Sequence, residues 1–188
     1  FFPETGDDLR WDELRDTAAK MARGKHAAGI LMGESVAIVH PNGRAGIEAL
    51  YACLYGGFRA TMINLAAGPD AIGYALAHSK ARFAFVHDSQ LSAFEEVAPE
   101  GMSLLDPYTL DSSSSLAPLA AEDHALLMYT SGTTCKPKWF VHSHASLLAG
   151  GWTTAIAHDL SPQDRGFCVL PIYHINGLCV TVMGALVS

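Results

Sequence analysis

Short apolar segments rich in β-branched and aromatic residues alternate with segments of helical periodicity, and this alternation restricts the fold more than any other feature. Strands separated by helices at this spacing form βαβ units, in which a largely parallel sheet carries helices on both faces. We therefore predict an α/β fold. Strands are expected at 35–40, 60–64, 82–87, 126–129, 140–142 and 168–170, and helices near 9–21, 47–54, 69–78, 90–97 and between 142 and 168.

The end of the sequence, 167–188, contains no formally charged residue and is long enough to span a bilayer. Pro171, His174 and Gly177 interrupt it. We therefore expect a buried strand followed by a buried helix rather than a membrane span. Because the apolar run stops without a helix cap, we also expect the sequence to be part of a longer domain.

Composition narrows the possible partners. The net charge is -7, and the 12 Lys and Arg residues are scattered, which argues against a nucleic-acid partner because phosphate binding needs clustered positive charge. The four cysteines contain no C-x-x-C pair and fit neither a zinc site nor a disulfide framework. Free thiols in an α/β chain are typical of a reducing compartment, so we expect a cytoplasmic protein.

One loop is unusually dense in small polar residues. It follows the strand predicted at 126–129 and reads Tyr-Thr-Ser-Gly-Thr-Thr-Cys-Lys-Pro-Lys from Tyr129 to Lys138. Hydroxyls, a permissive glycine and an ammonium group are what a polyphosphate needs, and ligands of parallel sheets bind beyond the carboxyl ends of the strands. The loop is not a Walker A motif, because Lys136 precedes Pro137. By composition alone, an ordinary polar loop remains the alternative.

The order of residues in this loop resembles the signature phosphate loop of the adenylate-forming superfamily, which includes acyl-CoA and aryl-CoA synthetases, luciferases and the adenylation domains of peptide synthetases. Trp11–Leu14, Ser35–Ile38 and Ile63–Leu65 resemble further segments of that family, and Leu170–Leu178 resembles a second motif near its acyl pocket. The resemblance implies that residues 1–188 are the N-terminal portion of the AMP-binding large domain, without its remainder and its small lid domain.

The activity implied by the resemblance is that of an acid–CoA ligase, in fatty acid metabolism or with another organic acid. A carboxylate attacks the α-phosphorus of ATP in the presence of Mg²⁺, pyrophosphate leaves, and coenzyme A then takes the acyl group. The fragment alone is expected to be inactive. The alternatives are a non-catalytic ATP- or phosphate-binding module, an adenylation domain that loads a carrier protein, and a degenerate structural piece. The sequence is compatible with a homodimer and does not identify the acid.

The resemblance also assigns site residues. Lys138 is the expected catalytic cation, His174 is expected to place the substrate carboxylate, and Thr134 is the expected Mg²⁺ ligand, whereas Lys136 is expected to be solvated. The residues expected to contact the β- and γ-phosphates of ATP are Thr130, Ser131, Gly132, Thr133, Thr134 and Lys138.

Two positions depart from the family pattern. Cys135 stands where the family nearly always has glycine, and Trp139 stands where glycine follows the lysine. If position 135 requires a positive φ, cysteine costs on the order of 1 kcal/mol there. Either the loop tolerates this cysteine or phosphate binding is impaired.

Other candidate residues have plainer interpretations. His142 and His144 have the i, i+2 spacing of a metal pair on a strand, but no third ligand is nearby, so solvent-facing or helix-capping roles are favoured. Trp11 and Trp152 are expected to be core or interface residues. Glu95 and Glu96 are expected on a polar helix face rather than in a catalytic carboxylate pair.

Overall fold

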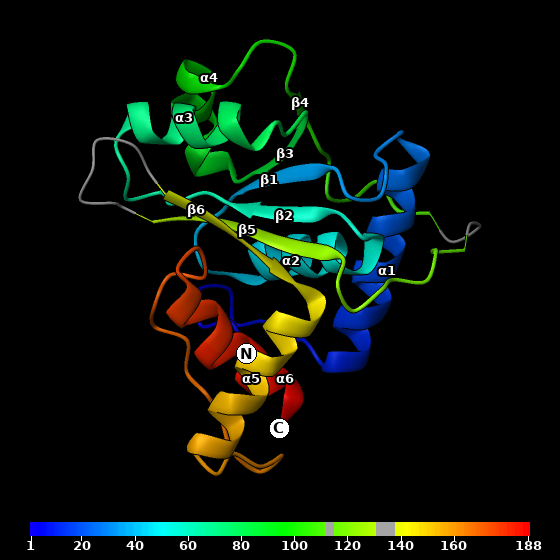
Figure 1. Ribbon diagram of the computed structural model, residues 1–188, viewed down its shortest axis with the longest axis vertical. Helices are drawn as coiled ribbons and strands as arrows, with labels where there is room; N and C mark the ends of the chain where they lie inside the picture. Colours follow the sequence, from blue (N-terminus) through cyan, green and yellow to red (C-terminus); the bar gives the residue numbers. More distant parts are fainter. Residues whose placement is uncertain (112–114, 131–137) are drawn as a thin grey trace.

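Six strands form one sheet in the computed structural model, which describes residues 1–111, 115–130 and 138–188. They are β1 (Ser35–Val39), β2 (Arg59–Met62), β3 (Phe83–Val86), β4 (Ser103–Leu104), β5 (His124–Thr130) and β6 (Lys138–Ser143). In the order β4-β3-β1-β2-β5-β6, the neighbouring strands are parallel except for β5 and β6, which are antiparallel (Figure 1). The predicted α/β fold with a largely parallel sheet is confirmed.

Helices cover both faces of this sheet. The helices α3 and α4 lie on one face, and α1, α2, α5 and the last helical segments lie on the other (Figure 1). Their bounds are α1 (Trp11–Ala27), α2 (Arg44–Gly56), α3 (Pro69–Ser79), the 3-10 turn η1 (Asp88–Gln90), α4 (Leu91–Val97), α5 (His144–Ala157), the π-helix η2 (Asn176–Met183) and α6 (Gly184–Val187).

Strand β1 shows why its sequence is apolar throughout. Successive side chains of a strand point to opposite faces, and a sheet covered on both faces buries both sets. Val36 and Ile38 belong to the core beneath α1 and α2, and Ala37 and Val39 to the core beneath α3. All five residues of β1 are buried, which explains a continuous hydrophobic run instead of an alternating one.

The end of the chain differs from expectation. The strand predicted at 168–170 was wrong: the carbonyls of Cys168 and Leu170 accept hydrogen bonds from the side chain of Asn42 instead of a strand partner. Phe167 and Val169 are 75% and 69% exposed rather than buried. The expected helix is present as η2 and α6. In the described ranges, every helix is too short or too polar to cross a bilayer.

Helix α1 makes a close backbone contact with the segment that follows β4. A Cβ atom placed on Gly24 would lie 2.2 Å from the carbonyl oxygen of Thr109. Next to it, the side chain of Lys25 is 1% exposed, and its ammonium donates to the carbonyl oxygens of Asp106 and Thr109. Burial lowers the pKa of Lys25, and the Asp106 carboxylate opposes that shift. This pair of residues fixes the connection between β4 and β5 against α1.

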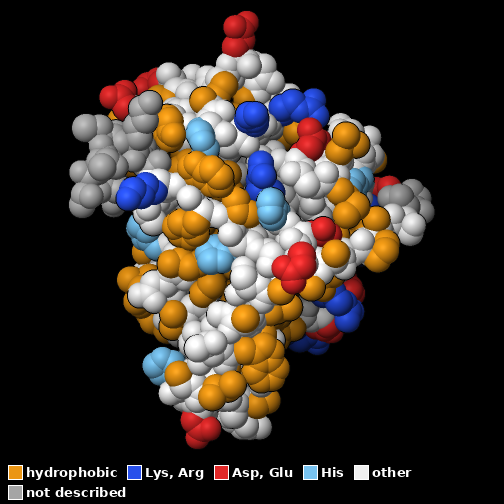
Figure 2. Space-filling model, viewed as in Figure 1, with side chains coloured by type: hydrophobic (Ala, Val, Ile, Leu, Met, Phe, Trp, Pro, Cys, Tyr) orange, Lys and Arg blue, Asp and Glu red, His pale blue; other side chains and the backbone are white. Residues whose placement is uncertain are grey.

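Two tryptophans expected in the core or an interface lie on the surface. Trp11 is 51% and Trp152 is 55% exposed, so the core expectation was wrong. Trp11 makes an edge contact with Tyr51, with ring centroids 6.3 Å apart. Ile156 in α5 is 74% exposed as well, and Figure 2 shows hydrophobic side chains gathered on the lower half of the molecule, where α5 lies in Figure 1. An interface role for the tryptophans stays a prediction.

Candidate active site

Polar residues collect at the carboxyl edge of the parallel strands. His40 follows β1, Asn64 lies just beyond β2, His87 follows β3, and Thr130 ends β5. Because parallel strands all end at the same edge, these residues come from distant parts of the sequence to one side of the sheet. This is the left side of the sheet in Figure 1, where β5 ends and β6 begins. The loop singled out in the sequence is therefore attached at the edge where α/β sheets bind ligands.

Thr130 and Lys138 are directly paired across β5 and β6. The Thr130 hydroxyl donates to the Lys138 carbonyl oxygen at 3.3 Å, and both residues are exposed. The pairing holds the two ends of the loop together and leaves the ammonium of Lys138 accessible. The other residues predicted for this site, Ser131, Gly132, Thr133 and Thr134, lie outside the described residues, as do Cys135 and Lys136.

An aromatic cluster supports the base of this loop from the α3 side. Tyr129 pairs with Trp139 across the two strands, and the Trp139 ring lies 5.5 Å from the ring of His78 in α3. The Tyr129 hydroxyl and His78 Nδ1 are 3.0 Å apart, and Tyr74 stacks on His78. Burial raises the pKa of Tyr129 to about 12, so its phenol keeps its proton near pH 7. The departure from glycine at position 139 thus coincides with a contact to His78.

Strand periodicity places Thr130 and Lys138 on the opposite face from Tyr129 and Trp139. That face carries the core that includes Ile172, so Lys138 and the segment around His174 share one face and one edge of the sheet. In the strand order, β6 and β1 are three spacings apart, or roughly 14 Å. The structure therefore brings Lys138 and the second predicted motif to the same side of the sheet.

Asn42 holds the second motif against the end of β1. Its Nδ2 donates to the Leu170 carbonyl at 2.9 Å and the Cys168 carbonyl at 3.4 Å, and its Oδ1 accepts from the Ile172 amide at 2.9 Å. Ile172 is buried under this contact. Asn42 comes shortly after the strand β1 in the sequence, between Pro41 and Gly43. Its role in positioning the Pro171–His174 segment depends on partners far along the chain, and no local signal indicates it.

Asn42→Ala should lower the free energy of unfolding by about 1–2 kcal/mol, because three hydrogen bonds are lost and the Ile172 amide is left without its acceptor. Urea denaturation measures the change. Asn42→Asp keeps an acceptor for the Ile172 amide but places a carboxylate oxygen against the carbonyl oxygens of Cys168 and Leu170, so it should be no more stable than Asn42→Ala. An unchanged Asn42→Ala midpoint would contradict this role.

His174 lies in the turn before η2. Its amide donates to the Pro171 carbonyl at 3.0 Å, its carbonyl accepts from the Leu178 amide, and its ring is exposed beside Tyr173. Gly177 allows this turn to close, since a Cβ there would lie 2.6 Å from the Pro171 carbonyl oxygen. The imidazole is therefore held on a fixed turn and is accessible to a ligand.

Two further histidines, His40 and His87, lie at the carboxyl edge of the sheet. The rings of His40 and His87 are 5.4 Å apart, and His40 is 8% exposed. Burial lowers the pKa of His40 to about 4, with a further lowering by His87 and an opposing effect of Asp88. His40 is therefore neutral near pH 7 and is suited to packing beside α2 rather than to binding an anion.

The pKa of His40 predicts a loss of stability in acid. Because the folded pKa lies below the usual value near 6.5, the unfolded chain binds the proton first, and stability falls as the pH drops from 6.5 towards 4. The loss attributable to His40 is about 3 kcal/mol in total. Urea denaturation of the wild type and of His40→Gln at pH 7 and pH 4.5 isolates it. Equal acid sensitivity of the two proteins would contradict the assignment.

The remaining candidates do not form a metal centre. His142 lies in β6 with its Nδ1 3.2 Å from the Ser146 hydroxyl, and His144 is the first residue of α5, so the two are not on one strand. Glu95 and Glu96 are exposed on α4. Within residues 1–111, 115–130 and 138–188, no group of three or more His, Cys, Asp or Glu side chains is arranged to hold a metal ion.

Comparison with known proteins identifies relatives over the whole chain. The model of the family described as AMP-binding enzyme matches residues 2–188. A sulfoacetate–CoA ligase of Cupriavidus necator is 36% identical over 98% of this chain and 39% of its own length, and a feruloyl-CoA synthase of Amycolatopsis is 29% identical over 97% of this chain and 38% of its own length. The chain thus spans about 39% of the length of the first of these relatives.

Solved structures share the fold. The o-succinylbenzoate CoA synthetase of Bacillus subtilis, solved with its acyl-adenylate intermediate, superposes with a TM-score of 0.81 at 23% identity, covering 97% of this chain and 48% of that one. At this identity the likeness establishes the α/β architecture. The family match over nearly every residue goes further: this chain belongs to the AMP-binding enzyme family.

Proposed function

We propose that these 188 residues form the N-terminal part of the large domain of an acid–CoA ligase. In the proposed reaction, a carboxylate oxygen attacks the α-phosphorus of ATP and pyrophosphate leaves. The thiolate of coenzyme A then attacks the acyl carbon of the acyl-adenylate, and AMP leaves. The observation that carries the proposal is the pairing of Thr130 with Lys138 at the carboxyl edge of the sheet.

The proposed chemistry needs positioned positive charge more than an acid–base pair. The exposed ammonium of Lys138 would neutralise charge on the phosphates, and the hydroxyl of Thr130 would help to hold the ends of the phosphate loop together. Ser131, Gly132, Thr133 and Thr134 would add amides and hydroxyls, and Thr134 would complete the shell of a Mg²⁺ ion. Such an ion would supply further charge neutralisation to the phosphates.

Coenzyme A is preferred over a carrier protein as acceptor because the two relatives compared by sequence are named as a CoA ligase and a CoA synthase. Those names span a sulfonated and an aromatic acid, so we leave the substrate as an organic carboxylic acid without narrowing it to fatty acids. The free thiols of Cys53, Cys168 and Cys179 agree with a cytoplasmic location, which we propose. A homodimer stays a prediction.

The proposed role of His174 is to place the substrate carboxylate. His174→Ala should raise KM for the acid by roughly 10-fold and leave KM for ATP within about 2-fold, since a single charge-assisted hydrogen bond is lost at the acid. Steady-state kinetics with each substrate varied in turn separates the two constants. Acid-dependent turnover equal to that of the wild type would show that the role is wrong.

Acid-dependent exchange of labelled pyrophosphate into ATP tests the proposal. Because the chain spans about 39% of its first relative, the assay uses the complete protein that carries these residues, with sulfoacetate, ferulate and o-succinylbenzoate as starting acids. Exchange that needs both an acid and Mg²⁺, followed by CoA-dependent thioester formation, is the expected result. ATP binding without exchange, across a wide panel of acids, would favour a non-catalytic nucleotide-binding module.

A further inference from the structure

One imidazole contacts both ends of the predicted phosphate loop. His78, near the end of α3, lies against Tyr129, which precedes Thr130, and against Trp139, which follows Lys138. Its Nδ1 is 3.0 Å from the Tyr129 hydroxyl, and its ring centroid is 5.5 Å from that of Trp139. The two strands that carry the loop are therefore joined through a single side chain of a third element.

The imidazole of His78 is itself held in place. Tyr74 lies one helical turn earlier on α3, and its ring stacks on that of His78 with centroids 5.4 Å apart and 21° between the planes. Between these two positions, Ala75 and Leu76 are 5% and 0% exposed in the core beneath α3. The helix is therefore anchored to the sheet at this point, and the stacking and the contact with Tyr129 fix the plane of the imidazole.

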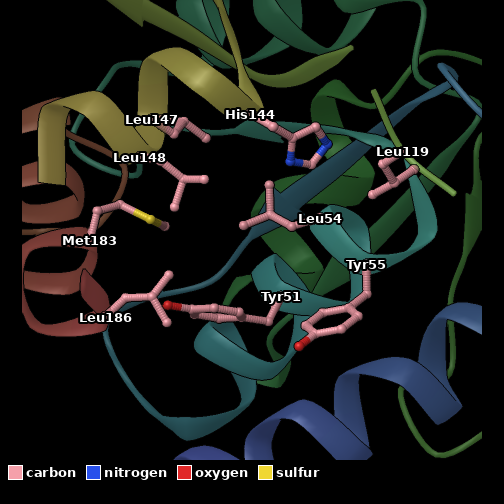
Figure 3. A pocket seen from close by; sticks show the side chains of 9 residues that line it. All are labelled: Tyr51, Leu54, Tyr55, Leu119, His144, Leu147, Leu148, Met183 and Leu186. Atoms are coloured by element: carbon pink, nitrogen blue, oxygen red, sulfur yellow. The ribbon is translucent and has the colours of Figure 1, made fainter. Parts of the chain in front are cut away.

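An edge strand such as β6 gains orientation from a contact of this kind. In the part of the chain that the structure describes, β6 pairs with β5 alone, and its first residues, Lys138 and Trp139, are exposed. At its other end, where α5 begins at His144, an apolar pocket of about 240 Å³ lies between α5 and α2 (Figure 3), so the packing there is not close. The contacts that orient the start of β6 are those with β5 and, through Trp139, with His78.

The contact with α3 also determines what happens on the opposite face of the sheet. Consecutive side chains of a strand point to opposite faces. A rotation of the start of β6 that displaced the Trp139 ring would therefore displace the Lys138 ammonium as well, and the same holds for Tyr129 and Thr130 at the end of β5. Holding Tyr129 and Trp139 against His78 thus fixes the directions of the Thr130 hydroxyl and the Lys138 ammonium.

We propose that His78 is a positioning residue of this site. It contacts no substrate, and it directs the Lys138 ammonium towards the phosphates of ATP by holding both ends of the loop. The inference rests on the proposed function, because it takes ATP as the ligand of Lys138. A displacement near 1 Å can cost on the order of 100-fold in rate. Loss of the contact between His78 and Tyr129 should therefore affect every reaction that uses the Lys138 amine or ammonium.

Labelling of Lys138 by an ATP acyl phosphate measures this placement without turnover. The γ-phosphate of this probe carries an acyl group. The lysine amine attacks the acyl carbon, an amide forms with loss of a proton, and ATP leaves. Labelled peptides of the complete protein are quantified by mass spectrometry, with the exposed Lys20 as the internal reference.

His78→Phe keeps a ring between Tyr74 and Trp139 but removes the atom that contacts Tyr129. Lys138 should then be labelled about five-fold or more slowly than in the wild type, because its amine is no longer held beside the probe. Labelling at the wild-type rate would overturn the proposal. A wild-type protein that is not labelled at Lys138 would overturn it as well.

Tyr129→Phe is the matched second variant, because it removes the other atom of the same contact. Each single variant should lower kcat for pyrophosphate exchange about five-fold or more and leave KM for the acid within about two-fold. The double variant should be no slower than His78→Phe, since all three proteins lose the same contact. Multiplied losses would contradict a shared role. Tyr108→Phe removes a hydroxyl from a tyrosine that is 83% exposed and should change neither measurement.

A purely structural role of His78 would give a different pattern. The variants would then unfold at lower urea concentrations, but the folded proteins, checked by circular dichroism, would label Lys138 and turn over at wild-type rates. Labelling of Lys138 that depends on His78, in a protein without acid-dependent exchange, would defeat the proposed function and support the positioning role. Unchanged labelling in the variants of an active protein would defeat the positioning role alone.

Discussion

Lys138→Ala is expected to lower kcat for acid-dependent pyrophosphate exchange by roughly 100-fold or more, which is the usual effect of removing one group that stabilises charge in a transition state. Lys138 begins β6, pairs with Thr130 and is exposed at the carboxyl edge of the sheet. The backbone pairing of Lys138 with Thr130 would fix the position from which its ammonium contacts the phosphates. Because the effect is on the transition state, kcat and kcat/KM for ATP should fall together.

Two control variants separate charge from shape. Lys138→Arg keeps the positive charge in a planar guanidinium group of different shape. It should therefore be more active than Lys138→Ala and less active than the wild type. Lys20→Ala removes an exposed lysine on α1 and should leave the kinetics unchanged. If Lys138→Ala retained more than about half of the wild-type rate, the proposed role would be wrong even with the family membership intact.

Among the substitutions, the largest expected effect on stability at neutral pH is at Gly24. Gly24→Ala should lower the free energy of unfolding by about 2–3 kcal/mol, because the added Cβ would lie 2.2 Å from the Thr109 carbonyl oxygen and the backbone has to move apart. Alanine is otherwise the better helix former by about 1 kcal/mol, so the steric cost must exceed that gain. The movement would also strain the hydrogen bonds from Lys25 to the same segment.

Gly73→Ala is the matched control for this prediction. Gly73 also lies within a helix, and a Cβ there would make ordinary contacts of 3.4–3.5 Å with Val97. We expect this variant to be neutral or up to about 1 kcal/mol more stable in urea denaturation. Similar losses in both variants would show that the contact between α1 and Thr109 is not the cause.

Local patterns predicted the part of the fold that depends on local chemistry. Continuous apolar runs predicted β1 and β5, and the helix predicted near 47–54 is the middle of α2, which ends at Gly56 before Gly57 adopts a left-handed conformation with φ 67°. The edge strand β4 was missed because its two residues are exposed and carry no apolar pattern. The segment 168–170 was misassigned because its apolar residues resemble a buried strand, whereas side-chain contacts hold it outside the sheet.

At the candidate site, too, some residues could be predicted from the local sequence and others could not. The order of residues in the loop from Tyr129 to Lys138 was sufficient to predict a phosphate site, and the structure places both ends of that loop at the expected edge. The contribution of Asn42 could not be predicted, since its partners are defined only once the chain has folded.

Asn42 has a consequence for how the protein is made. Its three hydrogen-bond partners lie 126 to 130 residues further along the sequence. During synthesis, β1, β2 and β3 can leave the ribosome well before residues 168–172 are made. At that stage the side chain of Asn42, just beyond β1, lacks these three hydrogen-bond partners. Contacts of such high sequence separation form late and slow the folding of a domain. The turn bearing His174 is therefore completed later than the strands β1, β2 and β3.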